Sequence, residues 1–257
     1  MESIYHQYYE EPRYRPSVLA AQRLAGGLLG RKSGRGFYAY DNGRPQAVPL
    51  PPAPDARPAR VWVSPARPAY ASAARELVCR LGGALDESQS PQDGALCLVT
   101  PLGEDATACA VREGLDPART VAIDVLPGLD RHRTLMATPL TLPAMREAAH
   151  GLFAADGVPA SVVRDSAGFV VQRVLAHIVN IGCDIAQQGI AQPADIDRAV
   201  TLGLGYPKGP LALGDALGPR TVLEILENLQ ASCGDPRYRP SPWLKRRALL
   251  GASLLTP

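Results

Sequence analysis

Aromatic residues, paired cysteines, metal-ligand motifs and excess charge are all scarce or missing in this 257-residue chain. Aromatic residues make up 5% of the sequence, and the five cysteines are scattered without a Cys-x-x-Cys pair. An odd, dispersed set of this kind indicates reduced thiols in a cytoplasmic protein rather than a disulfide or zinc framework. The four histidines lack metal-ligand spacing, so we expect no metal site.

The chain also lacks the features of nucleic-acid and membrane proteins. Its net charge of +2 gives no electrostatic reason to bind nucleic acid or a membrane surface. No apolar run reaches the roughly 18–20 residues that span a bilayer. With 46% hydrophobic and 20% charged residues, the composition is that of an ordinary globular protein.

Proline is abundant in one segment, which divides the chain. Residues 45–59 contain six prolines, and this density favours an extended linker. Before it, residues 1–44 read as two short helices, the second capped by Ser17, followed by a basic, Gly-rich hairpin or extended tail. So small a segment has too little core to stand alone, so we expect another surface to cover it.

Strands and helices alternate in residues 60–164. Short buried-type strands are predicted at 61–63, 95–99, 120–124, 135–137 and 160–163, with amphipathic helices over 70–82, 104–115 and 144–157. This alternation predicts a parallel, doubly wound sheet.

From Asp165 to the end, the pattern is helical. Asp165 or Ser166 is predicted to cap the first helix, which ends at Gly189. Its predicted core face comprises Phe169, Val170, Val174, Ile178, Ile181 and Ile185. Pro193 opens the next helix, and the Gly/Pro-rich loop 203–210 leads to further helices. The loop lacks the GxGxxG spacing and follows a helix, so its glycines are assigned to turn geometry rather than phosphate binding.

A sequence repeat links the two ends of the chain. Residues 12–17, Pro-Arg-Tyr-Arg-Pro-Ser, recur as residues 236–241, and each copy lies between an amphipathic helix and another short helix. The chain is therefore expected to begin inside a first copy of the domain formed by residues 165–257, as the C-terminal part of a longer protein.

Four motifs carry a family resemblance: DSAGFVVQRVL, DIDRAVTLGLGYPKGPLALGD, DPRYRPSPWL and LLGRKSGRGFYAY. They resemble the C-terminal helical domain of 3-hydroxyacyl-CoA dehydrogenases, and residues 60–164 resemble a degenerate form of the family's Rossmann domain. The arrangement is similar to long bacterial members with duplicated helical domains, including those that act on 3-hydroxyadipyl-CoA or 3-hydroxybutyryl-CoA. The resemblance implies hydride transfer between the 3-hydroxyl carbon of an acyl-CoA and NAD, with a His–Glu pair as base and an asparagine supporting substrate binding.

Most of the residues for this chemistry are replaced here. The turn after Val63 reads Ser-Pro-Ala-Arg-Pro-Ala, without the glycines that let a backbone approach pyrophosphate. The family's His-Phe-Phe-Asn-Pro stretch aligns with residues 135–139, where leucine replaces the histidine. His132 is interpreted as an exposed loop residue and Glu147 as a solvent-facing helix residue.

Gln172 occupies the family's asparagine position and is the one candidate catalytic residue. Its extra methylene displaces the amide by more than about 1 Å, which favours a polar helix residue over a catalytic contact. His177 is interpreted as a packing histidine. Arg31, Lys32 and Arg35 could meet CoA phosphates, although a solvated basic turn is the favoured interpretation.

The sequence thus predicts an α/β plus all-α chain. It comprises the tail of a first helical domain (1–44), a Pro-rich linker (45–59), a degenerate Rossmann-like domain with a parallel sheet (60–164) and a second helical domain (165–257). We expect it to be part of an NAD-dependent 3-hydroxyacyl-CoA dehydrogenase, with structural, dimerisation or substrate-enclosing roles and no bound cofactor of its own. Its expected partners are the upstream catalytic half of the same polypeptide, an acyl-CoA substrate and a second copy in a homodimer. An interaction-only module and a competent divergent dehydrogenase half remain as alternatives.

Overall fold

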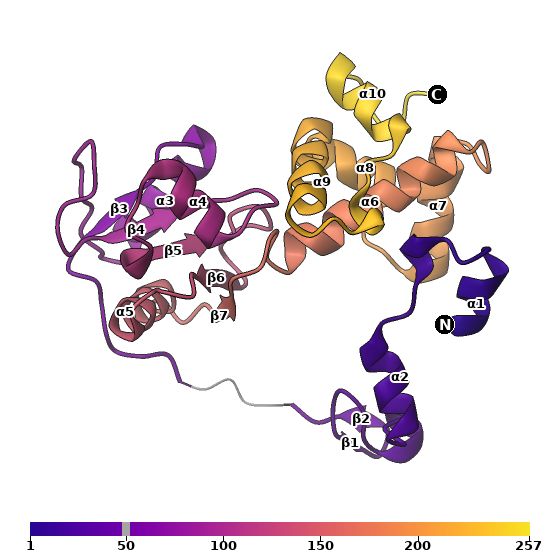
Figure 1. Ribbon diagram of the computed structural model, residues 1–257, viewed down its shortest axis with the longest axis horizontal. Helices are drawn as coiled ribbons and strands as arrows, with labels where there is room; N and C mark the ends of the chain where they lie inside the picture. Colours follow the sequence, from indigo (N-terminus) through magenta and orange to yellow (C-terminus); the bar gives the residue numbers. More distant parts are fainter. Residues whose placement is uncertain (48–51) are drawn as a thin grey trace. The chain divides into compact units, whose positions relative to one another are not determined.

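The computed structural model describes residues 1–47 and 52–257 and divides into two compact units, Met1–Pro52 and Ala53–Pro257. Part of the predicted linker, residues 48–51, lies outside the described residues. Figure 1 shows the elements of both units.

The first unit contains only short elements: α1 (Glu2–Gln7), η1 (Pro12–Tyr14), α2 (Val18–Ala25), η2 (Arg31–Ser33), β1 (Tyr40–Asp41) and β2 (Arg44–Pro45). The predicted cap of α2 is confirmed, because the Ser17 hydroxyl accepts a hydrogen bond from Leu19 N at 3.3 Å. The predicted hairpin is also present, with Asn42 and Gly43 both at positive φ in its turn. No side chain of residues 1–47 is buried within this unit.

A five-stranded sheet forms the first part of the second unit. Its strands lie in the order β3 (Val61–Val63), β4 (Leu96–Val99), β5 (Thr120–Ile123), β6 (Arg133–Ala137) and β7 (Ala160–Arg164). Its helices are α3 (Pro68–Arg80), α4 (Ala106–Glu113), η3 (Pro117–Arg119) and α5 (Pro143–Phe153). Alternate strand residues separate into two apolar clusters, one with α3 and α5 and the other with α4. Helices therefore cover both faces, as the predicted α/β fold requires.

The sheet is doubly wound, although on one side of β3 it continues only as a single isolated β-bridge. After α3, Leu85 pairs in parallel with Val61 on the edge of β3 that faces away from β4. The chain then crosses back to form β4 on the other side of β3. The winding direction therefore reverses between β3 and β4, which defines the topological switch point of the sheet.

One strand pairing departs from the predicted parallel sheet. Strands β3, β4 and β5 are mutually parallel, and β6 is parallel to β7, but β5 and β6 pair antiparallel. Residues 124–132 between them contain no helix. A parallel crossover needs about a dozen or more residues, whereas a short link between neighbouring strands reverses their direction. The sheet is therefore mixed.

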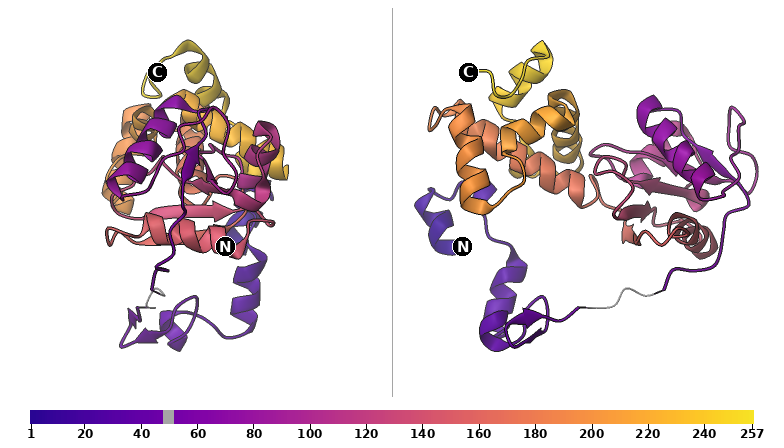
Figure 2. Two further views of the ribbon diagram at one scale, coloured as in Figure 1. Left: turned by 90° about the vertical axis from the view of Figure 1, so that its left-hand side faces the viewer. Right: turned by 180° about the vertical axis from the view of Figure 1, so that it is seen from behind.

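The second part of the unit is helical, as predicted. It comprises α6 (Val171–Gln187), α7 (Pro193–Leu204), α8 (Pro210–Leu217), α9 (Pro219–Cys233), η4 (Pro236–Tyr238) and α10 (Pro242–Leu250). Helix α6 packs against α7, α8, α9 and α10 around a separate apolar core. Figure 2 shows this helical part beside the sheet, with α6 starting next to the sheet.

The predicted start of the first long helix is wrong. Helix α6 begins at Val171, and its N-cap residue has no side-chain cap. Asp165 instead accepts hydrogen bonds from Ala106 N at 2.8 Å and Thr107 N at 3.2 Å, at the start of α4. The five residues between Asp165 and α6 allow the Asp165 carboxylate to lie at the start of α4, which it caps instead of α6.

The predicted core face of α6 is also corrected. Val170 and Val174 are exposed, whereas Ala176, Val179 and Cys183 lie in the core. Gly182 lies against Pro210, where a Cβ atom would approach the proline ring to 2.7 Å. The close approach of α6 to α8 requires glycine at position 182. Of the predicted residues, Ile178, Ile181 and Ile185 are half-buried.

Candidate functional site

Ligands of doubly wound sheets bind at the carboxyl ends of the strands, next to the switch point. In this chain, that position is formed by the segments that follow β3, β4 and β5. They are residues 64–67, residues 100–105 and Asp124. The candidate site is this carboxyl-end crevice.

The turn after β3 does not fit a dinucleotide. Pro65 and Pro68 have no N–H to offer a phosphate, and Pro68 occupies the first position of α3. Arg67, the residue before this helix, forms an ion pair with Glu224 of α9. The donors and the glycine geometry that bind pyrophosphate are therefore replaced by an interaction within the chain.

Helix α9 lies directly against the segment that follows β4. Asn228 donates a hydrogen bond to the Leu102 carbonyl oxygen at 2.8 Å. Gly103 has φ +70°, and a Cβ atom placed on it would lie 2.5 Å from the Ile225 carbonyl oxygen. Only glycine permits both this conformation and this approach. The helical part of the unit therefore occupies the crevice.

Gln172 is fully buried and joins the two parts of the unit. Its Oε1 accepts a hydrogen bond from Gly103 N at 2.8 Å, and its Nε2 donates to the Pro101 carbonyl at 3.0 Å and to Asp124 Oδ1 at 2.9 Å. Both amide hydrogens of a glutamine are thus used. The interpretation of Gln172 as a polar helix residue is refined by these contacts: it is a buried connector with no donor left for a substrate.

Asp124 is the other buried polar residue of the crevice. Its Oδ1 also accepts from Leu126 N at 3.2 Å, whereas its Oδ2 has no hydrogen-bond partner in the described part of the chain. Burial raises the pKa of Asp124 to about 6, and the Gln172 hydrogen bond partly opposes this rise. Burial also raises the pKa of Tyr70, which lies near Arg67 and Glu224.

The other sequence candidates lie outside this crevice. His132 is exposed, and its Nε2 lies 3.0 Å from Ser161 Oγ. Glu147 is exposed on α5, as predicted, and Leu135 is buried in β6. His177 packs edge-on against Tyr238, with 6.5 Å between ring centroids. None of these four residues belongs to the segments that form the crevice.

The two predicted loops have structural contacts of their own. In the loop 203–210, Gly205 has φ +68°, and Asp197 accepts hydrogen bonds from Leu211 N and Ala212 N, each at 2.8 Å. Gly205 therefore serves turn geometry as predicted, whereas Gly203 lies inside α7. Arg31, Lys32 and Arg35 are exposed in the first unit, and their contact with CoA stays a hypothesis.

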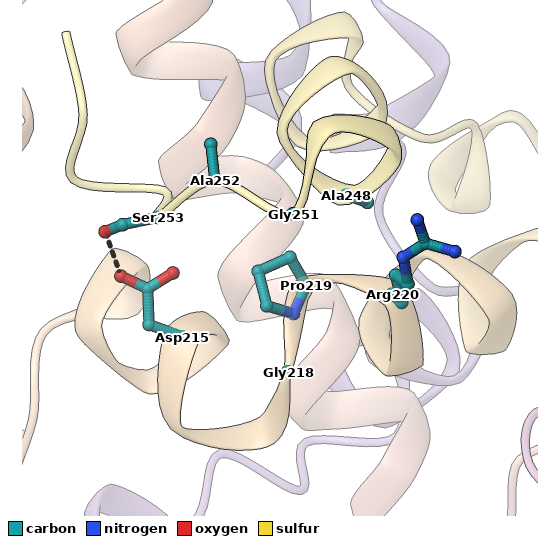
Figure 3. Close-up of a pocket in the computed structure, with 8 residues that line it drawn as sticks. All are labelled: Asp215, Gly218, Pro219, Arg220, Ala248, Gly251, Ala252 and Ser253. Atoms are coloured by element: carbon teal, nitrogen blue, oxygen red, sulfur yellow. Dashed lines mark hydrogen bonds between the residues drawn. The ribbon is translucent and has the colours of Figure 1, made fainter.

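A cavity of about 350 Å³ lies among α8, α9 and the end of α10 (Figure 3). On one side, Asp215 accepts hydrogen bonds from the Ser253 hydroxyl and from Leu254 N, the latter at 2.7 Å. On the opposite side of Pro219, Arg220 donates to the Leu249 carbonyl at 3.3 Å. These polar groups bind the C-terminal segment, so we assign the cavity to the helix junction.

Within residues 1–47 and 52–257, no group of three or more His, Cys, Asp or Glu side chains is placed to hold a metal ion. Among the helices found there, none is long and apolar enough to cross a membrane.

Comparison with known proteins identifies the helical part. Residues 168–253 match the family model described as 3-hydroxyacyl-CoA dehydrogenase, C-terminal domain. The chain is 32% identical to a 3-hydroxyadipyl-CoA dehydrogenase of Escherichia coli K12, over 96% of this chain and 47% of that protein. It is 41% identical to a probable 3-hydroxybutyryl-CoA dehydrogenase of Bacillus subtilis, over 37% of this chain and 33% of that protein.

A solved structure extends the similarity beyond the helical part. The crystal structure of a 3-hydroxybutyryl-CoA dehydrogenase from Escherichia coli K12 matches with a TM-score of 0.73 and 30% identity, covering 96% of this chain and 47% of that one. The resemblance to the 3-hydroxyacyl-CoA dehydrogenase family is therefore confirmed, and residues 168–253 match the C-terminal domain of that family. The chain spans about half the length of these two Escherichia coli relatives, 47% of each.

Sequence reasoning missed Asp124 as a site residue. In the sequence it is only the last residue of the strand predicted at 120–124. An acid that directly follows a buried strand in a doubly wound pattern is a signal that could have identified it, because that position faces the crevice. Its pairing with Gln172 depends on contacts between distant segments, which no local pattern encodes.

Proposed function

We propose that this chain is the C-terminal part of a larger NAD-dependent 3-hydroxyacyl-CoA dehydrogenase, in which it has a structural and substrate-enclosing role. The reaction of the whole enzyme would interconvert a 3-hydroxyacyl-CoA and a 3-oxoacyl-CoA. The names of the relatives and their length, about twice that of this chain, support this proposal. The catalytic site would then lie in an upstream half of the same polypeptide.

The single observation that carries the structural role is the occupied crevice. Arg67 pairs with Glu224, Gly103 lies against α9, and the amide of Gln172 is bound to three partners. NAD would have to displace these contacts and would then meet a turn with two prolines and no glycine. We infer that this chain binds no NAD and that the cofactor belongs to the upstream half.

Assembly into a homodimer is part of the same proposal. The exposed valines of α6, Val170 and Val174, lie on one side of the helix and support an apolar contact with another copy. Acyl-CoA binding by the whole enzyme, a cytoplasmic location and domain boundaries at residues 44, 59 and 164 complete the proposal.

Titration of the intact chain with NADH, followed by fluorescence, tests the inferred lack of cofactor binding. We expect no saturable change in NADH fluorescence. The Escherichia coli 3-hydroxyadipyl-CoA dehydrogenase serves as the reference protein. Saturation at micromolar NADH would contradict the inference. Turnover of acetoacetyl-CoA by this chain with NADH would instead support a competent dehydrogenase half.

A truncation of the full-length polypeptide tests the structural role. Removal of everything after residue 46 of this chain should impair assembly or raise KM for the acyl-CoA. Unchanged kinetic constants together with an unchanged oligomeric state would favour an interaction-only module.

A further inference from the structure

The sequence repeat provides two copies of one local structure in different surroundings. Residues 12–14 and 236–238 both form a 3₁₀ turn, and the helices α2 and α10 follow at the same offset. Arg15 and Arg239 have nearly equal backbone angles, with φ −56° and ψ 124° against φ −57° and ψ 116°. Ser17 and Ser241 cap their helices through hydrogen bonds of 3.3 Å. The local sequence therefore determines the same conformation twice.

The second copy shows what this conformation binds. Asn180 of α6 donates from Nδ2 to the Arg239 carbonyl at 2.9 Å and accepts at Oδ1 from Ser241 N at 2.8 Å. Asn180 and Ser241 are both fully buried. One asparagine therefore recognises the main chain of the turn, and it fixes where α10 meets the helix pair α6–α9.

Apolar contacts complete this seat. Leu244 and Ala248, one turn apart on α10, are 0% and 1% exposed and belong to the core shared with α6 and α9. Tyr238 of the turn also packs against this core. The turn and its helix together form a docking element for two helices.

In the first copy, the same element is less buried than in the second. Ser17 is exposed, Tyr14 is 37% exposed, and Leu24, the equivalent of Ala248, is 66% exposed. Ala20 and Leu24 line an apolar groove of about 640 Å³ together with Leu28, Phe37, Tyr38 and Tyr40. A surface of this kind on so small a unit is a binding surface.

We propose that residues 1–40 dock on a second helix pair of the α6–α9 kind, with an asparagine at the position of Asn180 and without its own Pro-Arg-Tyr-Arg-Pro-Ser turn. The proposal rests on the proposed function for the source of this partner, which is the upstream half of the longer dehydrogenase. Asparagine is specified because the second copy uses its amide to bind one carbonyl and one N–H of the turn, and the first copy presents the same two groups in the same geometry.

The side chains also predict how the partner differs from α6–α9. Leu244 and Ala248 are replaced by Ala20 and Leu24, so the large and small residues exchange places. The partner must therefore offer more volume opposite the first position and less opposite the second. This exchange disfavours docking of the first copy on the wrong helix pair.

A chimera of the intact chain tests docking directly. Residues 235–250 are replaced by the sequence of residues 11–26, so that the first copy of the element must bind α6–α9. We expect cooperative thermal unfolding with Tm lowered by about 5–10 °C through the size exchange, and recovery of most of that loss when the transplanted Ala20 and Leu24 equivalents are changed to Leu and Ala.

Asn180→Ala tests whether the Asn180 side-chain amide binds the turn in the chimera as it does in the parent chain. It should lower Tm by about 3–8 °C in the parent and by the same amount in the chimera, whereas Gln188→Ala, at an exposed position just after the same helix, should change neither. Loss of cooperative unfolding in both chimeras, or no effect of Asn180→Ala in a folded chimera, would overturn the proposal.

Hydrogen exchange of the intact chain gives an independent measurement. Amides of α2 should exchange about 100-fold faster than those of α10, because α2 has no buried residue whereas Leu244 and Ala248 of α10 are buried. Equal protection of the two helices would also overturn the proposal. Neither measurement depends on NADH binding or turnover, so their failure is distinguishable from failure of the proposed function.

Discussion

Substitution of Asp124 by asparagine should remove a pH dependence of stability that the buried crevice creates. Asp124 is 1% exposed, and burial raises its pKa from 3.8 to about 6. The folded protein therefore binds the proton more tightly than the unfolded chain does. The resulting stabilisation is complete below pH 3.8 and is lost as the pH rises through about 6.

The magnitude follows from the shift in pKa. A difference of about 2 units corresponds to about 3 kcal/mol between the fully protonated and fully ionised limits. Between pH 4.5 and pH 7.5, about 2 kcal/mol of this difference should be lost. Asparagine retains the acceptor for Gln172 and Leu126 N, but it places an amide donor where Oδ2 has no partner. That donor costs about 1–2 kcal/mol at every pH.

Urea unfolding of both proteins at several pH values provides the assay. The free energy of unfolding of the parent minus that of Asp124→Asn should fall by about 2 kcal/mol from pH 4.5 to pH 7.5. Other charged groups near the site, including Arg67, Tyr70 and Glu224, are common to both proteins, so their contribution largely cancels in the difference. A difference that stays constant over this range would refute the assignment of a buried, proton-binding carboxyl.

Three further substitutions test other contacts of the second unit. Gln172→Ala should lower the free energy of unfolding by about 2–4 kcal/mol, since it leaves Gly103 N and the Pro101 carbonyl unpaired. Gln188→Ala is the matched control. Equal effects of the two substitutions in urea unfolding would contradict the connector role of Gln172. Gly103→Ala should cost about 2 kcal/mol or more, because φ +70° and contact with Ile225 both oppose a side chain, and an unchanged Tm would show that α9 does not lie against this segment. Arg133→Met should cost about 3 kcal/mol at neutral pH, because the fully buried guanidinium pairs with Asp156 at 2.7 and 2.8 Å and holds the pKa of that carboxyl at about 2. The Asp156 contribution should be lost as the pH falls from 3.8 towards 2, so a variant whose deficit is as large at pH 2 as at pH 7 would be inconsistent with this ion pair.

Most elements could be predicted because their signals are local. Ser17 precedes an apolar periodic run and caps α2, and Pro193 opens α7 as its fixed φ favours. The buried strands β3 to β5 were predicted from short β-rich segments between turn residues. The proline-containing turn after Val63 excluded a glycine fingerprint without any knowledge of the fold.

The errors arose where distant segments compete for one residue. Asp165 has the residue type and position expected of an N-cap for the next helix, yet its carboxylate accepts hydrogen bonds from the start of α4. Val170 and Val174 fit an apolar helical period, yet close packing with α8 and α9 selects the face with Ala176 and Cys183. No helix is predicted in residues 124–132 either, but the alternation of strands and helices elsewhere led to the prediction of a parallel sheet, and β6 pairs antiparallel with β5.

Residue type and spacing along the chain were enough to predict the family resemblance, the helical and α/β parts, the repeat and the loss of the glycine turn. The positions of α9 in the crevice, of Gln172 against Asp124 and of Asn180 against the repeated turn were visible only in the folded chain. The contacts of Gln172 with Asp124 and of Asn180 with the turn join residues that are 48 to 61 positions apart in the sequence. Their partners are selected by burial, which forces polar groups from separate segments to satisfy one another.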